Sequence, residues 1–253
     1  MQTNTLYQER TYRKISDENG YFEYFSLSFL ETDLWIAIDK ESFSIKIKDY
    51  ILKKIIFYRK LLEEYLKNNP DFLTSFVPLK LDKNSPEIVQ EMIIASIKAQ
   101  SGPMATVAGA FSQFIAQDVI RNFKIKEIII ENGGDIFMKI TKAITISVFA
   151  GSSVLSEKVG VKINEKYSPL GICTSAGTVG YSTSFGKADA LMIACKSTLL
   201  ADAYATIYAN QVKTKDDVNR IINKIKNNKE IISALVIKND IIAYTGDFEL
   251  VFF

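Results

Sequence analysis

The segment from residue 126 to 163 contains short apolar runs that follow one another with turn residues, and no helical run, between them. Residues 126–130 and 136–140 flank the turn-forming sequence Glu-Asn-Gly-Gly-Asp at 131–135. Asn-Gly-Gly favours a hairpin turn because glycine adopts positive φ without steric cost. Further strand-like runs lie at 143–149 and 159–163. Consecutive strands of this kind indicate an α+β fold rather than regular βαβ alternation.

The flanking regions add helices and more strands. A hairpin is predicted at 20–40, followed by a long amphipathic helix over 45–67. A short edge strand and loop are expected from Leu73 to Leu81, where Pro78 limits pairing. Ser85 as N-cap and Pro86 at the first position start a helix that ends near residue 100. The remaining predicted elements are a small-residue helix over 104–123, a strand at 190–195, helices over 197–210 and 213–228, and strands at 231–237, 241–245 and 248–253.

Composition narrows the chemistry. The 253-residue chain contains no histidine, which excludes Ser–His and Cys–His nucleophile pairs and histidine metal sites. Proton transfer would have to use Asp, Glu, Lys, Tyr or water. Cys173 and Cys195 both lie in apolar strand-like runs, so buried reduced thiols are expected. The length suits one large domain over residues 1–253, or two fused halves.

Charge and hydropathy set expectations about partners and location. The net charge is +2, and the lysines are mixed with acidic residues, so no nucleic-acid partner is expected. The first residues are polar, and no stretch reaches the roughly 20 apolar residues of a membrane span. We therefore expect a cytoplasmic protein without a membrane partner. GxGxxG after a strand and GxxxxGK[ST] are both absent, so the Rossmann and P-loop signatures are missing.

The run from Gly171 to Asn210 is the most informative for chemistry. It begins with glycines and hydroxyl residues, which let a backbone approach a ligand and offer it donors. Asp202 and Thr206 then fall four residues apart, on one face of a predicted helix. A carboxylate and a hydroxyl so placed can share a hard cation such as Mg²⁺. Alternatively, Asp202 favours its own helix dipole and Thr206 bonds back to a carbonyl.

Two other segments also admit two interpretations. The turn before Asp135 is fully explained as a hairpin, but its glycines and the carboxylate could also clamp a polar ligand. The small residues that begin the helix over 104–123 allow close packing on a sheet, or close approach to a ligand.

Four blocks in order resemble the ApbE superfamily, the FAD:protein FMN transferases. They are SGPMATVAGAF at 101–111, ENGGDIF at 131–137, ICTSAG at 172–177 and ADAYAT at 201–206. The chain is most similar to a cytoplasmic, uncharacterised branch of ApbE-like proteins. The resemblance implies a two-part, T-fold-related α+β architecture, with FAD in a cleft between the halves and Mg²⁺ near its pyrophosphate.

The same resemblance implies roles for individual residues. By position, Asp202 and Thr206 would be metal ligands, with the backbone carbonyl of Ala108 as a third. A carboxylate near the acceptor hydroxyl could take its proton, and Asp135 or Asp189 is the candidate. The flavin-binding set implied by the family is Asn132, Gly133, Gly134, Thr174, Ser175, Gly177 and Tyr181.

The blocks also depart from the transferase pattern. Gly109 and Ala110 occupy the positions of the usual lysine-glycine pair, and Tyr181 begins the segment where the transferases carry a histidine. Two functional hypotheses are consistent with these residues. One is a Mg²⁺-dependent enzyme that transfers FMN from FAD to a Ser or Thr of an acceptor protein. The other is a flavin- or nucleotide-binding protein without transfer activity.

A third interpretation is a structural or interaction role. The helix over 45–67 or the terminal strands would then serve as an oligomer interface. The apolar end of the chain, ELVFF, makes a homodimer contact plausible there.

Overall fold

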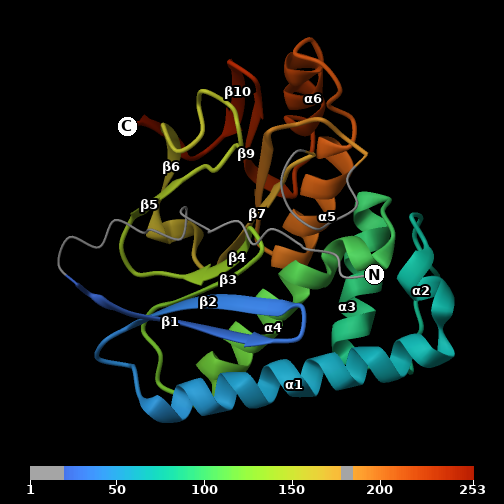
Figure 1. The fold of residues 1–253 in the computed structure, drawn as a ribbon, viewed down its shortest axis with the longest axis vertical. Coiled ribbons are helices and arrows are strands. Elements are labelled where there is room, and N and C mark those ends of the chain that lie inside the picture. The colour runs from blue at the N-terminus through green and yellow to red at the C-terminus, as the bar shows by residue number, and fades with distance from the viewer. Residues whose placement is uncertain (1–19, 178–184) are drawn as a thin grey trace, which may run out of the picture.

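The computed structural model describes residues 20–177 and 185–253, and its layers are shown in Figure 1. An antiparallel eight-stranded sheet has the order β1-β2-β3-β4-β7-β8-β9-β10, and a second sheet has the order β11-β6-β5. The α+β class is therefore confirmed. The strands are β1 (Phe22–Phe29), β2 (Thr32–Asp39), β3 (Ile128–Asn132), β4 (Asp135–Lys139), β5 (Ile144–Ser147), β6 (Val159–Ile163), β7 (Leu170–Ser175), β8 (Ala190–Cys195), β9 (Ile231–Lys238), β10 (Ile241–Gly246) and β11 (Glu249–Phe252).

Helices cover one face of the large sheet, and the small sheet covers the other (Figure 1). The helices are α1 (Ile45–Asn68), α2 (Pro70–Thr74), α3 (Glu87–Ala99), α4 (Val107–Asn122), α5 (Thr198–Ala209) and α6 (Asp217–Ile225), with short 3₁₀ turns η1 (Pro103–Thr106) and η2 (Glu165–Tyr167). Within the described residues, no helix is long and apolar enough to cross a membrane.

Alternation along the central strands produces two apolar cores. In β2, Ile36 and Ile38 pack in the core beneath the helices, while Ala37 packs in the core shared with the small sheet. In β3, Ile130 packs in the core beneath the helices, and Ile129 packs in the core shared with the small sheet. Successive strand residues point to opposite faces, so a strand covered on both sides is apolar throughout.

Most predicted elements are present close to their expected bounds. The Asn-Gly-Gly hairpin is confirmed: Asn132 pairs with Asp135, and Gly133 and Gly134 have φ values of 67° and 104°. The strand at 190–195 is buried throughout, and both cysteines are free and buried, as expected. Ser197 caps α5 through its side chain, which accepts from the amide of Leu200.

Two local predictions were wrong. No strand forms over 73–81, because Pro70 starts the short helix α2 and Ser75 then holds a turn by bonding both polar backbone groups of Val77. Ser85 is not a side-chain cap of α3, because its hydroxyl donates to the carbonyl of Asp82 at 2.7 Å. Pro86 occupies the N-cap position instead of the first helical position.

Candidate functional site

The side chain of Asp202 caps a helix other than its own. α5 begins at Thr198, so Asp202 lies beyond the first turn, where the dipole of α5 contributes little. Its Oδ2 instead accepts a hydrogen bond from the amide of Gly109, in the first turn of α4, at 2.9 Å. The carboxylate therefore lies at the positive end of α4. The amide that binds Asp202 belongs to a residue 93 positions earlier in the sequence. The sequence of α5 alone could not reveal this contact.

Glycine at position 109 permits the close crossing of α4 and α5. A Cβ there would lie 2.6 Å from the carbonyl oxygen of Thr198 and 3.0 Å from the Cβ of Asp202. No side chain fits in that space without moving the backbone. The small residues at the start of α4 thus serve helix–helix contact, as well as the packing on β3 and β4 expected for a helix above a sheet.

The β3–β4 turn meets the same end of α4. The side-chain amide of Asn132 donates to the carbonyl of Ala108 at 3.3 Å. The hydroxyl of Ser112 lies 3.1 Å from that carbonyl and 2.8 Å from the carbonyl of Asp135. Gly134 donates to the Glu131 carboxylate at 2.7 Å, and its carbonyl accepts from the amide of Thr174 at 3.1 Å. The turn and the helix end are therefore held together as one unit.

Asp135 and Asp202 form a pair of buried carboxyl groups. Burial raises the pKa of Asp202 to about 7, although the amides of Gly109 and Ala108 lower it. The pKa of Asp135 is raised well above its usual range, first by burial and then by the charge of Asp202, while a hydrogen bond from Cys173 opposes the shift. Within residues 20–177 and 185–253, neither carboxyl forms an ion pair with lysine or arginine. A divalent cation would relieve this repulsion.

Two further oxygen donors predicted as metal ligands lie on the same two helices, α4 and α5. Thr206 is half-buried, one turn beyond Asp202 on α5, and the half-buried Ala108 offers its carbonyl. No group of three or more His, Cys, Asp or Glu that could hold a metal occurs among the described residues. Mg²⁺ commonly takes one or two protein carboxylates and completes its shell with water and substrate phosphates, so a rich acidic cluster is not needed.

The other predicted site residues divide into three groups. Thr174 and Ser175 end β7 beside the β3–β4 turn, and Gly177 lies against Gly186, where a Cβ would be 2.2 Å from the Gly186 carbonyl oxygen. Asp189 is bound elsewhere, with Oδ1 3.2 Å from the ammonium of Lys238 and Oδ2 accepting from the amide of Asn239 at 2.5 Å. Tyr181 lies outside the described residues.

Cys173 and Ser112 join the site without having been predicted. Cys173 pairs directly with Asp135 across β4 and β7, and its Sγ also lies 3.3 Å from the carbonyl oxygen of Thr198. Burial and the two carboxylates raise the pKa of this thiol well above its usual range, so it is a neutral hydrogen-bond donor. Only the strand register could have revealed Cys173, whereas Ser112 follows Ala108 by one helical turn.

Comparison with known proteins gives the family. A family described as "AbpE bacteria" matches residues 13–240. The chain belongs to this family. The matched region contains α4, the β3–β4 turn, β7 and α5, and therefore all the described residues of the site.

Relatives of this AbpE bacteria family member include UPF0280 proteins of archaea. That of Methanococcus aeolicus is 38% identical over 224 residues, covering 87% of this chain and 88% of the relative. That of Methanocaldococcus jannaschii is 39% identical over 221 residues, covering 85% and 87%.

Solved structures share the fold at low sequence identity. The flavinyl transferase ApbE of Pseudomonas stutzeri has a TM-score of 0.53 at 11% identity, covering 88% of this chain and 93% of that one. The flavin transferase ApbE of Vibrio cholerae has a TM-score of 0.51 at 14% identity, covering 88% and 96%. These similarities establish an ApbE-like fold, in agreement with the resemblance of the sequence blocks.

Proposed function

We propose that the protein binds FAD with Mg²⁺ at the first turn of α4 and cleaves the FAD pyrophosphate, transferring FMN to a Ser or Thr hydroxyl of an acceptor protein. The observation that carries this proposal is the buried Asp135–Asp202 pair, which lacks a basic partner among the described residues and lies at the positive end of a helix. Such an end attracts phosphates, and the two carboxylates would attract the cation that accompanies them. The ApbE-like fold supports the choice of a flavin nucleotide.

Three oxygen donors would hold the cation: the Asp202 carboxylate, the Thr206 hydroxyl and the Ala108 carbonyl. When bound, Mg²⁺ would neutralise charge that develops on the pyrophosphate. Asn132 and Ser112 would keep the Ala108 carbonyl in place through their hydrogen bonds. The amides of Gly109 and Ala108 would hold the Asp202 carboxylate.

The proposed transfer is balanced with no other reactant. The acceptor hydroxyl oxygen bonds to the phosphorus on the FMN side of the pyrophosphate, and the bond from that phosphorus to the bridging oxygen breaks. AMP leaves, and the hydroxyl proton goes to a carboxylate. Asp135 is better placed as this base than Asp189, because Asp135 lies beside Asp202 while Asp189 is engaged by Lys238 and Asn239.

The second candidate is flavin or nucleotide binding without transfer. It is favoured by the complete absence of histidine and by Gly109, which fills the helix crossing where the transferases carry a lysine. The T-fold relation, the two related halves and the homodimer stay predictions under either function.

Incubation of the protein with FAD, with and without Mg²⁺, tests the choice. Cleavage would raise flavin fluorescence, because adenine no longer quenches the flavin, and would release AMP. We expect AMP only with Mg²⁺, and a loss of at least about a hundredfold in the Asp202→Ala variant, on the scale of removing a key electrostatic group. An unchanged rate in Asp202→Ala would remove the metal assignment. Binding of FAD with no AMP, with candidate acceptor proteins present, would favour the second candidate.

A further inference from the structure

We propose that Phe76 and Phe185 form a platform that stacks against a planar ring of the nucleotide bound at Asp202 and Thr206. This inference rests on the proposed nucleotide-binding function and names the residues that would recognise a ring, a role no sequence block indicated. The two rings come from distant parts of the chain, one from the segment after α2 and the other from the segment before β8.

Both aromatic side chains are exposed although they contact each other. The exposed fractions are 67% for Phe76 and 57% for Phe185, and the ring centroids lie 5.4 Å apart at an interplanar angle of 71°. This edge-to-face geometry leaves at least one broad ring face available. Exposed aromatic rings in contact with each other offer a ligand apolar surface, and exposing them to water does not stabilise the fold.

The backbone of Phe185 is held on both sides while its ring is exposed. Its amide donates to the side-chain oxygen of Asn210 at 2.8 Å, and its carbonyl accepts from the ammonium of Lys213. The next residue, Gly186, lies so close to the end of α5 that a Cβ would be 2.0 Å from the carbonyl oxygen of Ala209. The backbone that carries the ring is therefore tied to the end of α5 and to Lys213.

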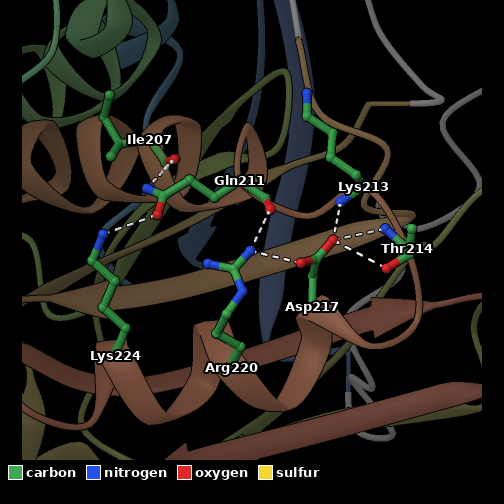
Figure 2. Close-up of polar contacts among 7 residues, drawn as sticks. All are labelled: Ile207, Gln211, Lys213, Thr214, Asp217, Arg220 and Lys224. Carbon is green, nitrogen blue, oxygen red and sulfur yellow. Dashed lines mark hydrogen bonds and ion pairs between the residues drawn. The ribbon is translucent and has the colours of Figure 1, made fainter.

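Figure 2 shows what fixes Lys213 in turn. Oδ2 of Asp217 accepts from the amides of Lys213 and Thr214, each at 2.9 Å, and Oδ1 accepts from Arg220 at 2.6 Å. Arg220 also donates to the carbonyl of Gln211 at 3.2 Å. The hydrogen bonds with Arg220 and the two amides hold the pKa of Asp217 below its usual range, so the cluster is ionised at neutral pH. This cluster holds the Lys213 main chain, and the Lys213 side chain reaches from there to the carbonyl of Phe185.

Phe76 is also held by its backbone. A Cβ on Gly102 would lie 1.8 Å from the carbonyl oxygen of Ser75 and 3.0 Å from the Cα of Phe76, so this part of the chain passes directly over Gly102. The Ser75 hydroxyl donates to the carbonyl of Val77 at 2.7 Å and accepts from its amide at 3.2 Å. Preorganised aromatic rings lose little freedom when a ligand stacks on them.

The platform is linked to the proposed metal site through both supporting segments. Asn210, which holds Phe185, lies roughly 12 Å beyond Asp202 along α5, with Thr206 between them. Gly102, which supports Phe76, precedes η1 and the first turn of α4, where Gly109 holds the Asp202 carboxylate. A nucleotide carries its ring on a sugar or ribityl spacer, away from its phosphates. A ring site two turns from the phosphate site matches that arrangement.

A planar ring fits this surface better than a partner protein does. A stable protein interface needs about 800 Å² on each partner, with many side chains. The exposed apolar residues close in sequence to the pair are only Leu73 and Val77 among the described residues of that region. A third ring stacked on one phenylalanine face and against the edge of the other completes an arrangement that aromatic groups favour.

Titration of FAD, FMN and ADP into wild type and into Phe76→Ala, Phe185→Ala and the double variant tests the platform. We expect each single variant to weaken FAD binding about tenfold, the scale of one stacked base. FMN carries the flavin ring and ADP the adenine ring, so the two ligands show which ring stacks on the platform. Only the ligand that carries the stacked ring should bind the variants more weakly than wild type. Phe185→Trp should retain FAD affinity. Phe252→Ala is the matched control, because Phe252 is 65% exposed on β11 in the small sheet, away from the site.

The outcomes separate the platform from the proposed function. FAD binding that is equal in the double variant and in Phe252→Ala overturns the platform and leaves the proposed function standing. Weakened binding in the double variant supports the platform even if no AMP forms in the wild type. No binding of any of the three ligands to wild type overturns both. If wild type sediments as a dimer and the double variant as a monomer, with FAD affinity unchanged, the pair belongs to a protein contact. That result also overturns the platform.

Discussion

Helix α4 has a buried carboxylate near each end, Asp118 from α4 itself and Asp202 from α5, and their surroundings differ. Near its C-terminal end, Asp118 accepts from the Tyr58 hydroxyl at 2.8 Å and pairs with the Lys54 ammonium at 2.9 Å. At the N-terminal end, Asp202 accepts from backbone amides and lies beside a second acid, Asp135. The first carboxylate has a resident cation. The second has only partial charges from the helix end, which are weaker than a full positive charge.

This difference separates a structural ion pair from a binding site. Lys54 and Tyr58 join α1 to α4, and the hydrogen bond to Asp118 raises the pKa of Lys54 while burial and that bond raise the pKa of Tyr58. Lys54 and Tyr58 therefore stay protonated, and the charge of Asp118 is balanced by Lys54 without any ligand. Asp135 and Asp202 are instead buried close together with no lysine or arginine partner among the described residues, which is unfavourable when both are charged. A ligand that carries positive charge would relieve this repulsion. Titratable groups with strongly shifted pKa values of this kind are typical of functional sites.

Removing Asp118 should give the largest change in stability. Asp118→Ala leaves Tyr58 and Lys54 without their acceptor, and we expect a loss of about 3 kcal/mol in the free energy of unfolding. Urea denaturation measures it. Asp118→Asn, which keeps an oxygen for Tyr58, should lose clearly less. Equal denaturation midpoints for Asp118→Ala and wild type would show that the cluster does not hold α1 on α4.

Adding one methyl group at the helix crossing should have the next largest effect. Alanine normally stabilises a helix relative to glycine by about 1 kcal/mol. At position 109 we expect the opposite sign, a loss of about 2 kcal/mol, because the new Cβ meets backbone of α5. Thermal unfolding of Gly109→Ala is the measurement. A stabilised variant would mean that α4 and α5 do not approach as closely as the distances at Gly109 indicate.

The smallest expected effect is a pH dependence that distinguishes the two ends of α4. The pKa of Asp202 is higher in the folded protein, so the folded state binds the proton more tightly than the unfolded chain does. Its stabilising contribution is complete below about pH 4 and is lost as the pH rises through about 7. Asp202→Asn should therefore gain stability relative to wild type as the pH rises through about 7, and should match wild type at about pH 4.

Asp217→Asn is the matched control for this pH series. The pKa of Asp217 is lowered, mainly by Arg220, so its contribution is present at neutral pH and is lost as the pH falls through its folded pKa. Its substitution should therefore destabilise at neutral pH, with the opposite sign to Asp202→Asn. Mg²⁺ should stabilise wild type at mildly alkaline pH and not Asp202→Asn. If the two variants show the same pH dependence, the electrostatic contrast between these carboxylates is wrong.

Local sequence signals predicted local structure well. The Asn-Gly-Gly turn and the amphipathic helix α1 each depend on residues within a few positions of one another. The failures have the same origin. Ser85 resembled a cap because a proline and a glutamate come directly after it, but its hydroxyl donates to a carbonyl three residues earlier, which spacing cannot exclude.

The candidate site was predictable only in part, because its contacts are long-range. The blocks around Asp135 and Asp202 were found, and the structure brings both residues together. The amide partner of Asp202 is 93 residues away, and the Tyr58–Asp118 bond spans 60 residues. Cys173 entered the site through strand register alone. No periodicity in a single sequence encodes such contacts.

The order of strands in the two sheets also bears on how the chain reaches this structure. β2 pairs with β3 only after α1, α2, α3 and α4 have intervened, and β6 pairs with β11 after β7, β8, β9, β10 and two helices. Pairings between distant segments close large loops, and folds dominated by them reach the native state slowly. The four helices between β2 and β3 must therefore leave the edge of β2 accessible until β3 pairs with it. Folding should therefore be limited by sheet assembly rather than by helix formation, and partly assembled chains would expose strand edges to one another.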